Sequence, residues 1–587
     1  MNLGIQQVFQ YPSEPIQETV SIQEVISSID EFWTRLLIQE DCLLKEIILA
    51  LWQQQEPLIF LPAWLQDKGI EIAEVPHQIE GIKKSLEKED LNKVFCLEND
   101  WFVLKKFSQR CRQFLNVVKE RFLKEKVSDF SRSPSASHAA FSEASLALSS
   151  LNTKQQQAVL KSLTSKLFVL TGGPGTGKTY TSKKIIEAQV LSLGKPQVRV
   201  ALLAPTGKAM VRLKQSIGEL AGGPFQIHFE AMTLHRFLYN RDVDYQLEKD
   251  PLAFDIVLVD ESSMVTLTLF ETLFQRVHES SVLILMGDPY QLPPVQSMPI
   301  FERLVDIAKA ADCWVHLDEC LRVENRALFD LSCDILQYGK GVNWQNLKLK
   351  LQSELLSLES YAGESSFMKA IEAVFPWTKL LADSRARFQD PVSFQDPAQA
   401  FKLLNKWICL CSTKSGPMGC DRINQLMYQK LRFELFKGFQ SREFQSDLII
   451  WVPVMATVNQ KELERVNGEM GLLTLPSFLV KQTPSLKLAM AKASQVLFYS
   501  EDGLQTISPL RLEGLAPAWA MTIHKSQGSE FEHVEALIAP ASSSSDSKAL
   551  LYTACTRAKK SLRIWQQKNC LEEMLAQPEK ASWLFSA

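Results

Sequence analysis

Short apolar runs alternate with amphipathic segments between residues 167 and 290. The runs LFVL, VRVALLA, DIVLV and SVLILM are almost continuously apolar and are bounded by polar residues. Strands of a parallel sheet that is covered on both faces carry such runs, whereas strands with one solvated face alternate. The intervening segments have helical spacing. The pattern therefore predicts an α/β fold with a parallel sheet.

A second series of candidate strands, KWICLCS and HVEALIA, predicts another sheet further along the chain. Residues 442–510 contain short strand-like runs and turns such as VNGEMG, which predict a small β-rich insert. Residues 1–127 are mainly helical in pattern, with an apolar face that includes Phe107, Cys111 and Phe114. The basic residues of the same helix form either a solvated face or a docking surface. Ser- and Ala-rich residues 128–150 predict a linker.

Composition adds little about partners. The chain has 64 Lys and Arg against 67 Asp and Glu, a net charge of −3, which argues only weakly against nucleic acid. The 11 cysteines show no zinc spacing and are typical of reduced cytosolic thiols. The start of the sequence predicts no signal peptide, and the most apolar run, LIIWVPVMATV, is too short to cross a bilayer. We expect a cytoplasmic protein with no membrane partner.

A glycine-rich loop follows the first of these strands and precedes a helical segment. The stretch GGPGTGKT fits the pattern G-x-x-x-x-G-K-[ST], whose backbone amides and helix N-terminus bind phosphate. Lys178 would reach the β- and γ-phosphates, and the Thr179 hydroxyl would bind Mg²⁺. The predicted nucleotide loop consists of Gly172, Gly173, Pro174, Gly175, Thr176, Gly177, Lys178 and Thr179.

Polar residues follow the next strands at the same predicted edge of the sheet. Asp260 ends DIVLV and is placed to hold Mg²⁺, and Glu261 could orient and deprotonate the attacking water. Gln291 follows SVLILM in GDPYQLPPV, where it could sense the γ-phosphate. Ligands of open α/β sheets bind at this carboxyl edge.

Two further loops could hold nucleic-acid phosphate. Thr206 and Lys208 lie in LLAPTGKAMVRL, and Thr233 and His235 lie in MTLHRFL. Taken alone, each of these residues is more often structural than functional.

Eight segments occur in the order of the superfamily-one helicase motifs: LNTKQQQAV, TGGPGTGKT, LAPTGKA, TLHRFL, DESSM, GDPYQLPPV, MTIHKSQGSEF and LLYTACTRAKK. In detail, and also in GPMGCDRINQLM, the chain resembles the RecD family, the 5′→3′ motor subunits of RecBCD (exonuclease V) repair complexes. The resemblance covers residues 151–587. It implies two RecA-like P-loop NTPase lobes, 151–335 and 336–587, with the β-rich insert in the second, after a partner-docking domain at 1–127.

The resemblance also implies an activity and its partners. It implies ATP- and Mg²⁺-dependent 5′→3′ unwinding of DNA ends by one subunit of a heterotrimer with RecB-like and RecC-like chains. In the family the nuclease site belongs to RecB, and Asp383 and Asp390 here lack a nuclease context. We therefore expect this chain alone not to cut DNA.

Residue roles follow from the same resemblance. Gln155 is implied to recognise adenine, and Arg322 and Arg557 are implied arginine fingers from opposite sides of a cleft. Leu321 stands where many family members have an aromatic residue. The implied DNA track consists of Thr206, His235, Thr522 and His524.

Other functions stay open on sequence alone. The chain could be a stand-alone superfamily-one DNA or RNA helicase, because recognition of the 2′-hydroxyl cannot be inferred from these motifs. It could also be a mainly structural subunit whose ATP site regulates assembly. The complete set of Lys178, Glu261, Gln291 and Arg557 argues against that alternative.

Overall fold

The computed structural model describes residues 47, 58–61, 74–88, 95–98, 101–124, 150–217, 226–239, 254–294, 300–321, 326–353, 355–361, 401–402, 404, 406–438, 449–463, 465, 467–493, 495–500, 503–539, 547–567 and 570–576. Nearly all of the predicted linker, Arg322, Asp383 and Asp390 lie outside these residues. The chain divides into two compact units, Met1–Phe107 and Ser108–Ala587. The domain boundaries expected from the sequence stay predictions. Within the described residues, no helix combines the length and the apolar character that a membrane span requires.

The smaller unit contains a short antiparallel sheet as well as helices. Its strand order is β1-β3-β2, with Leu58 opposite Val103. The sheet was not expected from the helical pattern of this region. The elements here are β1 (Leu58–Phe60), α5 (Val75–Lys88), β2 (Phe95–Glu98), β3 (Trp101–Leu104) and the start of α6 (Lys105–Lys124).

Beyond Phe107, helix α6 packs on helix α13 of the first lobe. The Phe114 and Phe274 rings meet edge-on at 5.5 Å between centroids. Arg110 Nε donates to Glu271 Oε1 at 2.9 Å, and Arg121 donates to the Phe274 carbonyl at the end of α13. A cation at a helix C-terminus is favourable. Arg110 and Arg121, two basic residues of α6, are therefore engaged in contacts with the first lobe.

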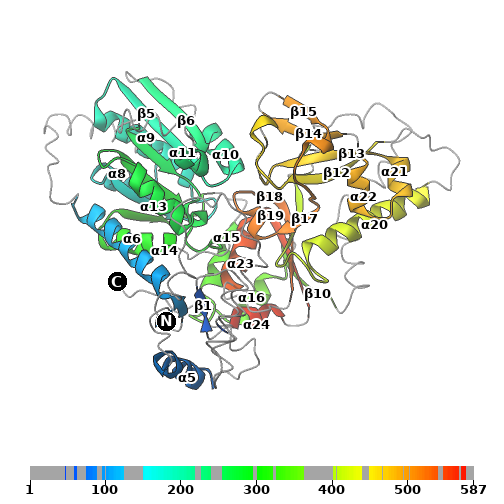
Figure 1. The fold of residues 1–587 in the computed structure, drawn as a ribbon, viewed down its shortest axis with the longest axis horizontal. Helices are drawn as coiled ribbons and strands as arrows, with labels where there is room; N and C mark the ends of the chain where they lie inside the picture. The colour runs from blue at the N-terminus through cyan, green and yellow to red at the C-terminus, as the bar shows by residue number, and fades with distance from the viewer. Residues whose placement is uncertain are drawn as a thin grey trace, which may run out of the picture. The chain divides into compact units, whose positions relative to one another are not determined.

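The first lobe is built on a six-stranded sheet, all parallel, in the order β6-β5-β7-β8-β4-β9 (Figure 1, cyan to green). The strands are β4 (Leu167–Gly172), β5 (Gln197–Ala204), β6 (Gln226–Thr233), β7 (Ile256–Val259), β8 (Val282–Gly287) and β9 (Trp314–Leu317). Its helices are α8 (Thr153–Leu163), α9 (Lys178–Leu193), α10 (Gly207–Ile217), α11 (Leu234–Tyr239), η2 (Ser262–Met264), α13 (Leu267–Arg276) and α14 (Ile300–Ala310).

The predicted apolar runs form the interior of this sheet. Every residue of β4, β7 and β8 is buried, as expected for strands covered on both faces. Strand β8 lies between β4, which leads into the glycine loop, and β7, which ends before Asp260. Because parallel strands share one carboxyl edge, this order brings the ends of β4, β8 and β7 side by side.

The second lobe is built on a five-stranded parallel sheet in the order β10-β19-β18-β11-β17. The strands are β10 (Leu356–Tyr361), β11 (Trp407–Cys411), β17 (Ala520–Thr522), β18 (Phe531–Ile538) and β19 (Ala558–Gln567). The accompanying helices are α15 (Arg326–Leu336), α16 (Trp344–Lys350), α20 (Cys420–Gly438), η6 (His524–Ser526), α23 (Ser547–Thr556) and α24 (Cys570–Ala576).

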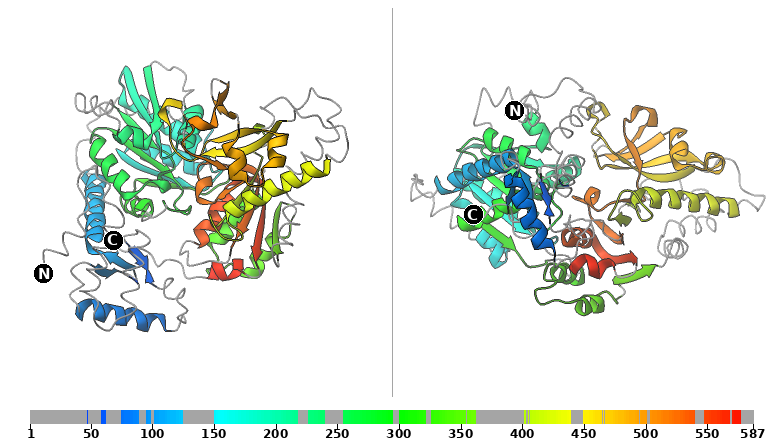
Figure 2. Two further views of the ribbon diagram at one scale, coloured as in Figure 1. Left: turned by 45° about the vertical axis from the view of Figure 1, so that its right-hand side comes forward. Right: turned by 60° about the horizontal axis from the view of Figure 1, so that its bottom comes forward.

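The predicted β-rich insert is a five-stranded antiparallel sheet in the order β15-β14-β13-β12-β16. It comprises β12 (Ile449–Ala456), η4 (Lys461–Leu463), β13 (Met470–Pro476), α21 (Ser477–Gln482), α22 (Leu486–Ala491), β14 (Gln495–Ser500), β15 (Gly503–Ile507), η5 (Pro509–Arg511) and β16 (Leu515–Pro517). Figure 2 shows these strands beside α20 in two further views.

The insert and the second sheet share a hydrophobic core. One cluster of buried side chains joins Cys409 and Cys411 of β11 to Tyr428 of α20 and to Val452 and Phe498 of the insert. The other face of β11, with Ile408 and Leu410, belongs to a separate cluster that contains α15 and α23. The predicted fold class is confirmed: each lobe has a parallel sheet, and the second lobe carries the β-rich insert.

Candidate functional site

The glycine loop adopts the conformation that its sequence predicts. Gly175 and Gly177 have φ values of 75° and 82°, in the left-handed region that favours glycine. The Lys178 ammonium folds back over the loop and donates to the carbonyls of Gly172 at 2.7 Å and Gly173 at 2.9 Å. The cation therefore already lies over the backbone curve where phosphate would bind.

Gln155 lies beside this loop, near the N-terminus of α8. Its Oε1 accepts from the Asn152 amide at 3.1 Å, and the Asn152 side chain accepts from the Gln155 amide, so the pair forms a capping box on α8. The Gln155 Nε2 atom is buried and has no hydrogen-bond partner among the described residues. A Cβ atom on Gly177 would lie 2.8 Å from it. An unpaired buried donor at the loop fits a base that offers ring nitrogens as acceptors.

Asp260 and Glu261 follow β7 at the carboxyl edge. Asp260 Oδ1 accepts from the Glu261 amide at 2.7 Å. Burial, reinforced by the neighbouring Glu261 charge, raises the pKa of Asp260 to about 7, while Lys178 and Arg212 act in the opposite direction. A divalent cation would offset the same repulsion, so the carboxylates fit a Mg²⁺ site.

The backbone at Glu261 is strained. It is one of two non-glycine residues with positive φ in the described chain, at φ 51° and ψ 41°. Strained residues of this kind are held in place by their surroundings and concentrate at functional sites. The geometry turns the chain immediately after Asp260, into η2.

Replacing Asp260 by asparagine is expected to stabilise the metal-free protein increasingly as pH rises. The folded pKa near 7 lies above the ordinary 3.8, so ionised Asp260 lowers the free energy of unfolding as pH rises through that window. The variant carries no such charge. Thermal unfolding in EDTA should show a Tm difference that grows from pH 4 and levels off above pH 7. The same change at exposed Asp330 is the control. A Tm difference that does not vary with pH would contradict the assignment.

Gln291 is buried next to Asp288 at the end of β8. Its Nε2 donates to Asp288 Oδ2 at 3.3 Å, and its Oε1 is buried and has no hydrogen-bond partner in the part of the chain that the structure describes. As at Gln155, one atom of the side-chain amide is hydrogen-bonded within the protein, and the other atom could contact a ligand. The roles predicted for Gln155 and Gln291 stay predictions.

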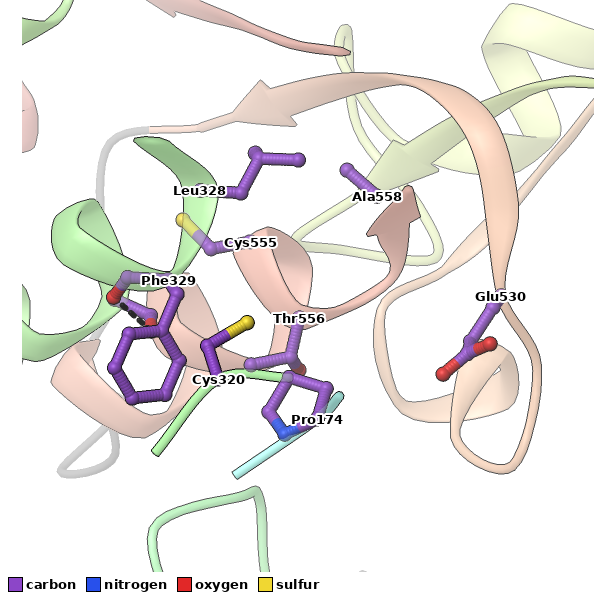
Figure 3. Close-up of a pocket in the computed structure, with 9 residues that line it drawn as sticks. Pro174, Cys320, Leu328, Phe329, Glu530, Cys555, Thr556 and Ala558 are labelled. Carbon is purple, nitrogen blue, oxygen red and sulfur yellow. Dashed lines mark hydrogen bonds between the residues drawn. The ribbon is translucent and has the colours of Figure 1, made fainter. Parts of the chain in front are cut away.

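A pocket between the two lobes is lined by Pro174 of the glycine loop and by the end of α23 (Figure 3). Phe329 lies near the loop, because a Cβ atom on Gly173 would be 3.6 Å from its ring. The lining residues are Pro174, Cys320, Leu328, Phe329, Ser332, Glu530, Cys555, Thr556 and Ala558. The first lobe thus faces the second at the predicted nucleotide site.

Arg557 lies between two of these lining residues, Thr556 and Ala558, and is itself buried. Its guanidinium donates to the carbonyls of Ser529 at 3.1 Å and Thr553 at 3.3 Å, and to Thr556 Oγ1 at 3.1 Å. The group is held inside the second lobe, one residue away from the pocket wall. Its role as an arginine finger stays a prediction.

The other predicted finger, Arg322, lies outside the described residues. Its neighbour Leu321 contacts the glycine loop. The Leu321 amide donates to the Gly175 carbonyl at 3.0 Å, and a Cβ atom on Gly177 would lie 3.0 Å from Leu321 Cδ1. The segment that leads into Arg322 therefore covers the loop beside Gln155.

The predicted DNA residues occupy loops of both lobes. Thr206 Oγ1 accepts from the Ala209 amide at the start of α10, and Thr522 Oγ1 accepts from the Lys525 amide. His235 is exposed at the start of α11, and His524 begins η6. Thr206 and the loop after β17 are neighbours, because a Cβ atom on Gly528 would lie 3.5 Å from Thr206 Oγ1.

Lys208 of the first lobe, like Thr206, lies against the second lobe. Its Nζ is 5.6 Å from the centre of the Phe531 ring, and burial, followed by the charges of Arg212 and Lys559, lowers its pKa to about 8. Arg212 donates to the Gly528 carbonyl and pairs with Glu530 at 2.9 Å. The DNA-binding roles of these residues stay predictions.

Sequence reasoning did not assign several residues that join the lobes. Arg212, Leu292, Gln527, Tyr552 and Thr553 all make contacts across the interface. All five lie inside the segments LLAPTGKAMVRL, GDPYQLPPV, MTIHKSQGSEF and LLYTACTRAKK, and only their proximity to the motif residues could have drawn attention to them. Among the described residues, no cluster of three or more His, Cys, Asp or Glu could hold a further metal ion.

Comparison with known proteins agrees with these motifs. Residues 155–297 match the family described as an AAA domain, and residues 517–565 match the UvrD-like helicase C-terminal domain. RecBCD enzyme subunit RecD from Mycolicibacterium smegmatis is 27% identical, over 70% of each chain. The subunit of the same name from Haemophilus influenzae is 27% identical, over 73% of this chain and 70% of its own.

Among solved structures, Bacteroides Pif1 bound to ssDNA is 18% identical, with a TM-score of 0.40, over 73% of this chain and 94% of that one. The helicase motifs, the two parallel sheets and the similarity to RecD subunits lead to one conclusion. The chain is therefore similar to the RecD-like helicases of superfamily one.

Proposed function

We propose that the chain is an ATP-driven 5′→3′ DNA translocase and helicase. In this proposal it is the motor subunit of a RecBCD-type complex that unwinds double-strand DNA ends for recombinational repair. One observation carries the motor assignment: Pro174 of the glycine loop in the first lobe and Cys555 and Thr556 at the end of α23 in the second line one pocket. Nucleotide turnover there can change the distance between the lobes, which a single-lobed ATPase cannot do.

The residues of the first lobe supply the nucleotide site in this proposal. The backbone N–H groups of Gly173 and of Gly175–Thr179 and the Lys178 ammonium bind the phosphates, and Gln155 Nε2 donates to the adenine. Thr179 and Asp260 would hold Mg²⁺, which would neutralise charge on the phosphates. Glu261 accepts the proton of the attacking water, and Gln291 Oε1 lies free to contact that water or the γ-phosphate.

The second lobe completes the site on closure. Arg557 is held by carbonyls and a hydroxyl of its own lobe, so a small approach of that lobe can exchange one of these contacts for a phosphoryl oxygen. A guanidinium that contacts the γ-phosphoryl only in the closed cleft couples hydrolysis to movement. Opening after hydrolysis then advances the strand by one step.

The strand would lie across loops of both lobes, contacting Thr206, His235, Thr522 and His524. Contacts of this type bind phosphate without sequence preference. Their 5′→3′ polarity follows from the RecD resemblance. Residues 1–127 are proposed to dock on RecB-like and RecC-like subunits, and the proposal keeps the cytoplasmic location expected from the sequence.

Single-stranded DNA is expected to stimulate phosphate release by the purified chain at least about tenfold. We expect the apparent affinity for DNA to fall steeply as salt rises, because phosphate contacts release counterions. The measurement is steady-state ATP turnover with oligonucleotides of identical sequence as DNA and RNA. Equal stimulation by both, or by RNA alone, would favour the RNA helicase. Turnover that neither nucleic acid changes would contradict the motor function.

A further inference from the structure

Leu292 belongs to the first lobe in sequence but to the second lobe in packing. It follows Gln291 directly, yet its fully buried side chain is part of the hydrophobic core that contains α15, α23 and β18. Its amide donates to Thr553 Oγ1 at 2.9 Å, and its carbonyl accepts from Gln527 Nε2 at 2.6 Å. The backbone beside Gln291 is thus held on both sides by the second lobe.

Tyr552 makes a second connection to the same segment, one residue before Thr553. Its hydroxyl donates to Asp288 Oδ2 at 2.8 Å, the oxygen that also accepts from Gln291 Nε2. Burial raises the pKa of Tyr552 well above its ordinary value of 10, so the hydroxyl keeps its proton. Two hydrogen bonds, from Tyr552 to Asp288 and from Gln291 to Asp288, therefore connect α23 to the Gln291 amide at the predicted nucleotide site.

The Tyr552 hydroxyl also lies close to the glycine loop. A Cβ atom on Gly173 would be 3.3 Å from it. The ring is held independently of the hydroxyl, since it meets the Tyr290 ring edge-on at 6.1 Å between centroids. Removal of the hydroxyl alone should therefore leave the ring in place.

We infer that Tyr552 is a positioning residue that fixes Gln291 through Asp288 and thereby transmits the nucleotide state to the second lobe, with Leu292 as the mechanical anchor. The inference rests on the proposed motor function. It explains why the Asp288 carboxylate, which is only 1% exposed, faces the second lobe. Without the tyrosine hydroxyl, Gln291 alone would occupy the shared oxygen, and its amide could turn without moving α23.

The test is Tyr552→Phe in the full chain, measured as base pairs separated per ATP hydrolysed. We expect this ratio to fall about tenfold, because a hydrogen bond to a buried carboxylate typically shifts a two-state equilibrium by about that factor or more. The ratio does not depend on the fraction of active protein. A merely structural role would lower ATP turnover and unwinding in proportion and leave the ratio unchanged, which would overturn the inference.

Tyr428→Phe is the matched control. Tyr428 is also fully buried, and its hydroxyl donates to the Thr483 carbonyl at 2.9 Å, within the second lobe and its insert. We expect this variant to keep the wild-type ratio. A similar fall in both variants would overturn the assignment to Tyr552.

A double-mutant cycle with Asp288→Asn tests the chain of contacts. If Tyr552 acts through Asp288, the double variant should resemble Asp288→Asn alone, and fully multiplicative effects would overturn the relay. Failure of the underlying motor function is distinguishable, since the wild-type chain would then show no DNA-stimulated turnover. If the wild-type chain unwinds DNA and Tyr552→Phe separates as many base pairs per ATP, only the role inferred for Tyr552 is refuted.

Discussion

Replacement of Lys178 by glutamine is expected to abolish DNA-stimulated ATP hydrolysis and unwinding, with a loss of at least about a hundredfold in turnover. The ammonium is the cation that the structure places over the glycine loop, 2.7 Å from the Gly172 carbonyl. Loss of a single preorganised group that stabilises developing charge typically costs a factor of about 10²–10³. Phosphate release with saturating single-stranded DNA is the measurement.

The fold should survive this change. The contacts of the Lys178 side chain are with carbonyls of its own loop, to which a glutamine amide can also donate. Tm and circular dichroism should therefore match the wild type. Exposed Lys154→Gln on α8 provides the control for loss of one positive charge near the site. Turnover near the wild-type level in Lys178→Gln would refute the nucleotide assignment.

Replacement of Arg557 by lysine or alanine is expected to lower turnover by about a thousandfold or more while nucleotide binding persists. Arginine fingers contribute about 10³–10⁵ in rate, and an ammonium cannot reproduce the planar fork of a guanidinium. Steady-state hydrolysis and equilibrium titration with a fluorescent ATP analogue separate the two effects. The lysine variant matters because alanine would leave the Ser529 and Thr553 carbonyls without their donor.

Arg563→Lys is the matched control for Arg557. Arg563 lies on β19 of the same lobe and donates to Ser357 Oγ at 3.2 Å, within its own sheet. We expect its turnover to stay close to the wild-type value. If both Arg557 variants retained turnover within tenfold of the wild type, Arg557 could not be the finger.

Strands with continuous apolar runs could be predicted from the sequence, and edge strands could not. The predictions for β4, β5, β7 and β8 are confirmed to within a residue or two. Strand β6 (Gln226–Thr233) was missed because it lies at the edge of the sheet, where most of its side chains keep some exposure and the apolar run is lost. Strand β9 at the opposite edge was missed for the same reason.

The site was predictable where local chain geometry determines it. The positive φ angles of Gly175 and Gly177 require the glycines that identified the loop. Contacts between the lobes require no comparable residue pattern in the sequence. Arg212 and Glu530 are 318 positions apart, and Tyr552 meets Asp288 across 264 positions, so only the folded chain brings them together.

The core that joins the insert to the second sheet has a consequence for how force acts on the molecule. Cys409 and Cys411 of β11 pack in the same cluster as Val452 and Phe498, while the Leu472 and Leu497 side chains of the insert pack in a second cluster with Phe401 and Leu404. A load applied to the hairpin of β14 and β15 would reach β11 almost undamped, since close-packed interiors transmit strain. We therefore expect the insert to move together with the second lobe as one body.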